Sequence, residues 1–313
     1  MSDHPRLTAL VTGGAGFIGS HLVRRLVADG HSVRVVDDLS TGHRENLEGC
    51  AVEIAARDLS RDALDDLVRG VDVVFHLAAI PSVPRSVSAP LHSHEASATA
   101  TLRLLEACRA AGVPRFINSS SSSVYGNVAQ PPMRESMPTL PRSPYAVAKL
   151  AAEGYTRVFA GLFGMSTVSL RYFNVFGPRQ DPKSAYAAAI PRFMTAYLQH
   201  ERPKVFDDGL QSRDFTYVAN VVEANLCAAR AVRLGGESVN IAAGSPRTVL
   251  DLLHAIAEIV GDWIEPEFLP PRPGDIRDSH ADITLARELL DYSPRVDFAD
   301  GLRETVEWVR GQV

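Results

Sequence analysis

Two residue types that can do proton chemistry together, Tyr145 and Lys149, lie four residues apart in the stretch SPYAVAK. On a helix this spacing places both side chains on one face. A free tyrosine has a pKa of about 10, and a nearby cation favours its phenolate form. The pair could therefore act as a base toward a hydroxyl group. Tyrosine and lysine also occur at this spacing on ordinary helix surfaces, so the pair needs a supporting context.

A run of five serines, residues 119–123, begins the stretch SSSSSVYG, which lies upstream of this pair. Such runs often mark flexible linkers. Here the run follows directly on a short apolar segment, Arg115–Ser119, which is expected to be a strand. Open α/β sheets bind ligands beyond the carboxyl ends of their strands. The position of the run therefore favours a site over a linker.

A glycine-rich stretch, VTGGAGFIGSH, follows the first expected strand and contains Gly13, Gly16 and Gly19. Glycines at this spacing allow a tight turn and bring backbone N–H groups close to a diphosphate at a helix N-terminus. Asp37 ends the second expected strand, where a carboxylate binds the adenosine ribose hydroxyls. Its charge, with that of Asp38, would repel a 2′-phosphate. The sequence therefore predicts NAD rather than NADP as cofactor.

The elements that would position these residues alternate along the first half of the chain, which predicts an α/β fold with a doubly wound parallel sheet. Prolines and loops become frequent after about residue 176, which indicates a smaller second lobe. The expected strands are Leu7–Val11, Val33–Val36, Val52–Ala55, Val71–Leu77, Arg115–Ser119 and Thr167–Tyr172. The expected helices are Phe17–Asp29, Thr99–Ala111, one after Ser143, Val249–Val260 and Leu302–Val309.

Composition limits the classes of function. The chain has 313 residues, of which 45% are hydrophobic and 22% charged, as in a soluble globular protein. A net charge of -5 argues against nucleic acid and anionic membranes as partners. Cys50, Cys108 and Cys227 form no CxxC pair, so we expect reduced thiols in a cytoplasmic protein and no metal site. We expect no signal peptide and no bilayer-spanning segment, because no apolar run is long enough.

Longer motifs make a family resemblance specific. The stretches TGGAGFIGSHL, VDDL, HLAA, SSSSSVYG, SPYAVAK, RYFNVFGPRQDP, SRDFTYVANVVEA and PRPGDIRDSHADI run through nearly the whole chain. With them the chain resembles the extended short-chain dehydrogenase/reductases, and most of all the NAD-dependent UDP-sugar 4-epimerases that act on UDP-N-acetylglucosamine. The resemblance implies a Rossmann NAD-binding domain at residues 1–176, rejoined by about 216–243. Residues 177–215 and 244–313 would form a smaller α/β lobe that binds the UDP-sugar.

The resemblance assigns catalytic roles to three residues. The family's catalytic hydroxyl lies four residues before the tyrosine of VYG, which gives Ser121 here. Tyr145 would be the base, while Lys149 and the positive nicotinamide would lower its pKa to near 7. That lowering corresponds to about 4 kcal/mol of differential interaction. Lys149 would also hold the nicotinamide ribose, and Ser121 would hydrogen-bond the reacting oxygen.

The cofactor site implied by the resemblance combines the glycine-rich turn with residues at the ends of later strands. Its predicted members are Gly13, Gly16, Phe17, Ile18, Gly19, Asp37, Asp38, Asp58, Leu59, Leu77, Ala78, Ala79, Tyr145, Lys149, Tyr172 and Val175.

The serine run also separates neighbouring reactions. Sugar-nucleotide 4,6-dehydratases carry Asp-Glu where this chain has Ser122 and Ser123, and UDP-glucuronate decarboxylases carry Glu at the second position. Serine is a poor acid-base for elimination, so the resemblance implies inversion at C4. Ser122 and Ser123 are expected to line the sugar pocket, whereas Ser119 and Ser120 are expected to pack at the strand end.

The substrate site implied by the resemblance is spread over the second half of the chain. Asn174 matches a residue typical of enzymes that act on neutral sugars. Arg213 and Arg272 match arginines that bind the UDP diphosphate, and Asp275 matches a ligand of the uridine ribose. The stretch 186–190, with Ala189 and Ile190, is expected beside the uracil. Ser279 matches a size filter, where a small residue admits an N-acetyl group and tyrosine excludes it.

Some features depart from the family or leave alternatives open. The family usually has N-x-x-G-T where this chain has the stretch Ala96–Thr101, so one cofactor contact could be missing or supplied by Ser97 or Thr99. His21, His76 and His280 lack ligand spacing and are expected to be structural.

UDP-glucose and UDP-glucuronate remain alternative substrates, and a non-catalytic NAD(P)-binding sensor or scaffold is the alternative of another class. The family also implies a homodimer that buries helices near 99–111 and 146–161.

Overall fold

The computed structural model of the chain describes residues 6–127, 130–181, 189–271 and 277–312. Its centre is a seven-stranded sheet in the order β11-β6-β5-β4-β1-β2-β3, and every neighbouring pair is parallel. Its strands are β1 (Thr8–Thr12), β2 (Ser32–Val36), β3 (Ile54–Ala55), β4 (Val73–His76), β5 (Arg115–Ser121), β6 (Ser166–Tyr172) and β11 (Gly235–Ile241). The predicted doubly wound parallel sheet is confirmed.

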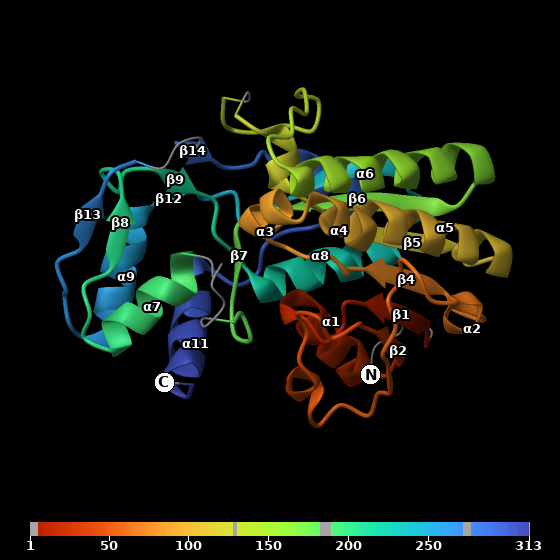
Figure 1. The fold of residues 1–313 in the computed structure, drawn as a ribbon, viewed down its shortest axis with the longest axis horizontal. Helices are drawn as coiled ribbons and strands as arrows, with labels where there is room; N and C mark the ends of the chain where they lie inside the picture. The colour runs from red at the N-terminus through yellow and green to blue at the C-terminus, as the bar shows by residue number, and fades with distance from the viewer. Residues whose placement is uncertain (1–5, 128–129, 182–188, 272–276, 313) are drawn as a thin grey trace.

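Alternating residues of the strands face two different layers of helices, as the two-residue period of a strand requires. In β1, for example, Ala9 and Val11 belong to one buried cluster and Leu10 to another. Helices α1 (Phe17–Ala28), α8 (Val218–Arg230) and α10 (Thr284–Leu290) contribute to the first cluster. Helices α2 (Asp65–Val68), α5 (Ala100–Ala111) and α6 (Pro144–Phe163) contribute to the second. Figure 1 shows α5 and α6 above the sheet and α1 below it.

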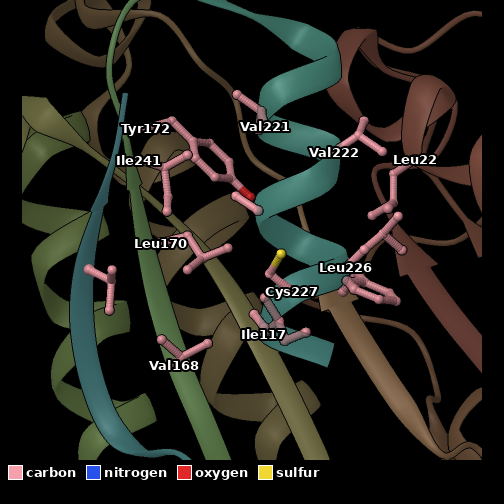
Figure 2. Packing of buried hydrophobic residues seen from close by; sticks show 14 of the residues in the cluster. Leu22, Ile117, Val168, Leu170, Tyr172, Val221, Val222, Leu226, Cys227 and Ile241 are labelled. Atoms are coloured by element: carbon pink, nitrogen blue, oxygen red, sulfur yellow. The ribbon is translucent and has the colours of Figure 1, made fainter. Parts of the chain in front are cut away.

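Helix α8 lies between the sheet and α1. Figure 2 shows its Val221 on the side of the strands and its Leu226 on the opposite side, where Leu22 of α1 lies. All three residues are at most 4% exposed. The strand β11 that follows α8 pairs with β6 and forms the edge of the sheet. The chain therefore returns to the main sheet after residue 216.

A third apolar cluster holds together a smaller group of elements at the other end of the molecule (Figure 1). Its helices are α7 (Ala189–Leu198), α9 (Val249–Val260) and α11 (Phe298–Arg310). Three short sheets accompany them: β7 (Val175–Phe176) with β10 (Thr216–Tyr217), β8 (Lys204–Phe206) with β13 (Glu267–Leu269), and β12 (Arg247–Thr248) with β9 (Ser212–Arg213) and β14 (Asp278–Ser279).

The predicted lobe boundaries stay a prediction. The packing of α10 differs from the lobe to which its residues were assigned. Residues 244–313 were assigned to the smaller lobe. Ala286 and Leu290 of α10 instead join the apolar cluster of the main sheet, as does Tyr292 just beyond the helix. A helix of only seven residues buries its few apolar side chains against the nearest large surface, which is formed here by β11 and α8.

The remaining helical segments are short: α3 (Val83–Ser88), α4 (Pro90–His94), a π turn at Glu95–Thr99, and 3-10 turns at Arg44–Leu47 and Ser122–Tyr125. Several predicted strand boundaries need correction: β3 and β4 begin at Ile54 and Val73, two residues later than predicted. The strand expected to end at Ser119 continues to Ser121, because Ser120 and Ser121 keep their register with Arg171 and Tyr172 of β6. The first three serines of the run therefore belong to the strand itself.

Candidate active site

A cleft of about 640 Å³ lies beyond the carboxyl ends of β1, β2, β4, β5 and β6. Ligands of open parallel sheets bind at this edge. The structure brings the residues predicted to contact the cofactor together here. All of them line the cleft: Gly13, Gly16, Phe17, Ile18, Gly19, Asp37, Asp38, Asp58, Leu59, Leu77, Ala78, Ala79, Tyr145, Lys149, Tyr172 and Val175.

The glycine-rich turn is packed too closely for side chains. A Cβ on Gly19 would lie 2.1 Å from the carbonyl oxygen of Gly13, and a Cβ on Gly13 would lie 2.8 Å from the backbone nitrogen of Ala78. Gly13 also has a φ of +66°, which favours glycine. Helix α1 begins after Gly16 with no side-chain cap. Its first N–H groups can therefore bind an anion, as a dinucleotide diphosphate requires.

The carboxylate of Asp37 is fixed at the end of β2 and can accept further hydrogen bonds. It accepts hydrogen bonds of 2.9 Å from the N–H groups of Ala15 and Leu39. Burial raises the pKa of Asp37, and these two hydrogen bonds lower it. A carboxylate can accept about four hydrogen bonds, so two positions remain for ribose hydroxyls. The turn and this carboxylate together fit an NAD molecule.

Helix α6 places Tyr145 and Lys149 in the cleft. Ser143 caps the helix by accepting the N–H of Ala146 at 3.2 Å, and Pro144 occupies the first turn, where its missing N–H costs nothing. Lys149 is 4% exposed. Its Nζ donates hydrogen bonds to the carbonyl oxygen of Ser119 at 2.7 Å and to its Oγ at 3.3 Å. The motif SPYAVAK is thus the start of a helix that packs on the serine strand.

The protonation of the pair follows from burial. Burial raises the pKa of Tyr145, and a hydrogen bond with Ser121 opposes this effect. Burial also lowers the pKa of Lys149 to about 8, against the charge of Glu153, which raises it. In the protein alone, burial outweighs the groups that favour the phenolate, so the net effect raises the pKa of Tyr145 instead of lowering it. The predicted fall in this pKa stays a prediction for the protein with oxidised nicotinamide bound.

The five serines have different surroundings. Ser121 and Ser122 line the cleft, while Ser123 turns toward Ser121 and donates its hydroxyl to the Ser121 Oγ at 2.9 Å. Ser119 and Ser120 were expected only to pack at the strand end. Ser119 instead accepts from Lys149, and Ser120 donates to Glu153 Oε1 at 2.5 Å. Buried hydroxyls need such partners, which simple strand-end packing would not supply.

The predicted substrate residues are less concentrated than the cofactor residues. Asn174 lines the cleft with a φ of +33°, and its buried Nδ2 has no partner among the described residues. Arg213 and Ser279 face each other in the pairing of β9 with β14, outside the lining of the cleft. Ala189 begins α7 at the surface, whereas Ile190 is 3% exposed in the apolar cluster of the smaller lobe. Arg272, Asp275 and residues 186–188 lie outside the described residues.

A buried ion pair behind the cleft was not predicted. Glu153 and Arg171 are 2% and 3% exposed and form two hydrogen bonds, of 2.9 and 2.7 Å. The Arg171 guanidinium also stacks 4.7 Å from the ring centroid of Tyr125 and donates to its hydroxyl at 2.8 Å. One signal could have revealed Glu153, because it lies one helical turn after Lys149.

Two of the histidines have structural hydrogen bonds. His76 bridges the hydroxyls of Thr12 and Thr101 at 2.8 and 2.9 Å, and burial, with a smaller effect of Lys149, lowers its pKa to about 3. His21 contacts the Pro178 carbonyl oxygen at 2.8 Å. His280 has a buried Nδ1 without a partner among the described residues.

The segment that departs from the family pattern contains the π turn. Ala96 and Ala100 from this segment line the cleft. Ser97, one of the two candidates for the missing asparagine contact, is 2% exposed, and its Oγ has no partner in the described structure. The contact it was proposed to supply stays a prediction.

The fold and the cleft define an NAD-binding enzyme of the short-chain dehydrogenase/reductase type. The sequence pattern of the NAD dependent epimerase/dehydratase family matches residues 9–242, and the chain belongs to this family. The predicted family and the predicted NAD cofactor are thereby confirmed.

Three relatives are similar over their whole length. A UDP-glucose 4-epimerase of Mycolicibacterium smegmatis is 41% identical over 98% of this chain and 99% of its own. The structure of UDP-N-acetylglucosamine 4-epimerase from Methanobrevibacter ruminantium, in complex with UDP-N-acetylmuramic acid, is 41% identical with a TM-score of 0.95, over 99% of this chain and 100% of that one. UDP-glucose 4-epimerase from Thermotoga maritima, with UDP-glucose, is 39% identical with a TM-score of 0.91, over 98% and 99%.

The described residues lack two kinds of feature. Across residues 6–127, 130–181, 189–271 and 277–312, no helix is long and apolar enough to span a membrane. The same residues contain no group of three or more His, Cys, Asp or Glu side chains arranged to hold a metal ion.

Proposed function

We propose that this NAD-dependent UDP-sugar 4-epimerase interconverts UDP-N-acetylglucosamine and UDP-N-acetylgalactosamine. The observation that carries the choice of substrate is the position of Ser279. This residue, the predicted size filter, lies opposite Arg213, the predicted diphosphate ligand, in the β9–β14 pair. A small side chain beside the diphosphate arm would leave room for an acetamido group. Similarity to the UDP-N-acetylglucosamine 4-epimerase of Methanobrevibacter ruminantium supports the same substrate.

The proposed chemistry divides between three side chains at one end of the cleft. Tyr145 takes the proton of the sugar 4-hydroxyl, and Ser121, hydrogen-bonded to Tyr145, orients the same oxygen. Lys149 favours the phenolate by its charge and binds the nicotinamide ribose. NAD supplies a reversible two-electron acceptor for C4. Inversion then requires that the sugar turn over within the cleft before C4 is reduced again.

The neighbours of Ser121 support inversion rather than elimination. Ser122 lines the cleft, and Ser123 is held by its hydrogen bond to Ser121. Neither position offers a carboxyl group that could remove a proton from C5 of the sugar. The intermediate ketone therefore has no acid-base partner here for loss of the 6-hydroxyl.

The alternative substrates differ in size and charge. UDP-glucose is smaller and would fit beside Ser279 as well. Two of the similar enzymes are named UDP-glucose 4-epimerase. UDP-glucuronate carries a carboxylate. Asn174, which lines the cleft, matches a residue typical of enzymes that act on neutral sugars and so favours an uncharged substrate. The non-catalytic alternative is disfavoured because Ser121, Tyr145 and Lys149 are all present.

A homodimer accompanies the proposal, and one exposed apolar face supports it. Helices α3 and α4 pack against α6, and Figure 1 shows them just below it. The large exposed hydrophobic side chains of this face are Val83, Val87 and Leu91 on α3 and α4, and Val147, Tyr155, Val158, Leu162 and Phe163 on α6. Within its described residues, α5 contributes none of them. A cytoplasmic location is proposed from the three cysteines, which form no disulfide.

The proposed substrate is tested with a panel of purified UDP-sugars. Each sugar, with and without the N-acetyl group and with the C6 carboxylate, is incubated with the NAD-loaded enzyme, and the C4 epimer is quantified. We expect kcat/KM to be highest for UDP-N-acetylglucosamine and UDP-N-acetylgalactosamine. A clear preference for UDP-glucose or UDP-glucuronate would overturn the substrate while leaving the reaction type in place.

A further inference from the structure

The buried carboxylate of Glu153 is bound only by donors. Its Oε1 accepts from Ser120 Oγ at 2.5 Å and from Arg171 Nε at 2.9 Å. Its Oε2 accepts from Arg171 Nη2 at 2.7 Å and from Ser238 Oγ at 2.8 Å. An arginine can only donate, so the arrangement fits an ionised carboxylate with its acceptor sites filled. At 2% exposure this is a fixed negative charge inside the protein.

This charge lies on the same helical face as the two proposed catalytic residues. Tyr145, Lys149 and Glu153 follow one another at intervals of four residues in α6, so their side chains lie in one row. Glu153 also reaches the catalytic strand. It binds Ser120, which lies between Ser119, the partner of Lys149, and Ser121. The carboxylate of Glu153 therefore contacts β5 where α6 packs on it.

We propose that Glu153 is a positioning residue of the catalytic pair, which fixes Ser120 beneath Ser121 and keeps the buried amine of Lys149 charged. The proposal rests on the proposed roles of Tyr145 and Lys149. Its basis is that Lys149 has only the neutral oxygens of Ser119 as hydrogen-bond partners in the described structure. A buried ammonium with neutral partners needs a nearby negative charge to remain protonated.

Other ionisable groups around α6 do not supply that charge. His76 on β4 is neutral, and Tyr172 on β6 has a pKa raised by burial. Arg171 on β6, Arg115 on β5 and Arg157 on α6 are cations, and Arg171 is bound by Glu153 itself. Glu95 before α5 pairs with Arg61 at 3.1 Å, and Glu237 on β11 accepts the N–H of Gly235. The remaining groups on α3, α4, α5 and the turn after β5 are cationic, neutral or at the surface: Arg85, His92, His94, Arg103, Glu106, Arg109 and Tyr125. Burial lowers the pKa of Lys149 to about 8, and the charge that opposes this is that of Glu153.

Loss of the Glu153 charge should lower the pKa of Lys149. Lys149 is protonated below its pKa and neutral above it. When Glu153 becomes neutral, burial acts unopposed and Lys149 loses its proton at a lower pH. Residues four apart on a helix lie about 5 to 6 Å apart at Cβ, and an opposite charge within about 4 to 6 Å changes a pKa by about 1 to 3 units. The alkaline limb of turnover should therefore move to lower pH in Glu153→Gln, whereas a purely structural role would lower activity equally at all pH values.

The chain allows Lys149 to be followed directly. It contains three lysines, Lys149, Lys183 and Lys204. Protein labelled with ¹³C and ¹⁵N at lysine should give three sets of side-chain NMR signals, and Lys149→Arg identifies the set that belongs to Lys149. Its titration is recorded in the wild type, in Glu153→Gln and in Glu153→Asp, which keeps the charge. The matched control is Glu223→Gln, because Glu223 is another buried carboxylate bound by arginines, on α8 and away from the cleft.

We expect the Lys149 midpoint to fall by about one pH unit or more in Glu153→Gln. It should stay near the wild-type value in Glu153→Asp and Glu223→Gln, and the alkaline limb of kcat should shift in parallel. An unchanged midpoint in folded Glu153→Gln would overturn the proposal. If that variant does not fold, Glu153→Gln/Arg171→Gln removes the unpaired guanidinium; its midpoint should fall by less than one unit, because a cation is lost with the carboxylate, and a midpoint at or above the wild-type value would overturn the proposal. If the wild type epimerises no UDP-sugar, the proposed function fails, and the NMR titration still decides the role of Glu153.

Discussion

The two halves of the site are built differently. The cofactor half is formed by the ends of adjacent parallel strands and by the helix that packs on them, and every residue predicted for it lines one cleft. The substrate half depends on loops and two-residue strands of a second group of elements. Of its predicted residues, Ser122 and Asn174 line the cleft, whereas Arg213 and Ser279 pair elsewhere.

This contrast has a physical origin. In a parallel sheet, the register of hydrogen bonds fixes where each strand ends, so residues far apart in sequence meet at one edge. Loops have no such register, and their positions depend on local turns and on the packing of the smaller lobe. Such a local contact is seen at Asp214, next to β9, which accepts from the N–H groups of Ala243 and Gly244 at 3.0 and 3.1 Å.

The largest expected effect is at the junction of the two halves. Tyr145→Phe keeps the ring and removes the base, so we expect kcat to fall about a hundredfold to ten-thousandfold, with NAD affinity and melting temperature unchanged. Tyr155→Phe on the same helix is the control, because Tyr155 lies outside the lining of the cleft. The assay is C4 inversion of a UDP-sugar. Near-normal turnover in Tyr145→Phe would show that the base is another group.

A smaller effect is expected in the substrate half, where it should depend on the sugar. Ser279→Tyr would fill the space proposed for the acetamido group. We expect kcat/KM to fall about a hundredfold or more for UDP-N-acetylglucosamine, equivalent to about 3 kcal/mol, while some activity on UDP-glucose remains. Ser279→Ala should preserve the wild-type ratio of the two substrates. If the tyrosine variant also keeps that ratio, the size filter lies at another position.

The smallest effect is expected in the cofactor half, where many contacts share the binding energy. Asp37→Ala removes one ribose ligand, so we expect NAD to bind about tenfold more weakly and its preference over NADP to narrow. Asp72→Ala is the control, because Asp72 accepts the N–H of Thr8 at the opposite end of the sheet. Isothermal titration with both dinucleotides measures the change. Identical affinities in the wild type and Asp37→Ala would exclude the ribose role.

The difference between the halves also explains what could be predicted from the sequence. The sheet, the glycine-rich turn and the start of α6 follow from local patterns, because apolar strand runs, glycine spacing and a Ser-Pro helix start each have a local cause. The end of β5 was placed two residues early, since serine has no strong strand preference and only pairing with β6 extends the strand. The packing of α10 and the β9–β14 pair depend on contacts between distant segments, which no local pattern encodes.

The Glu153–Arg171 pair shows another limit of the sequence. Both residues read as ordinary charged positions, one in a helix and one in a strand, and charged residues are usually exposed. Their burial follows from the crossing of α6 over β6, which brings a carboxylate and a guanidinium together in the interior. The spacing of Glu153 from Lys149 places it on the catalytic face of the helix. Its partner on β6 could be found only from the structure.

The late return of β11 to the sheet has a consequence for synthesis on the ribosome. When residue 176 has left the exit tunnel, the emerged chain contains six of the seven strands of the main sheet, but β6 has an unpaired edge and the sheet face that α8 covers is bare. Both are closed only after residue 241 has left the exit tunnel. Exposed strand edges and apolar faces recruit other chains. During that interval the emerging polypeptide should be a substrate for ribosome-associated chaperones, and a transcript truncated near codon 176 should yield aggregates rather than a free NAD-binding domain.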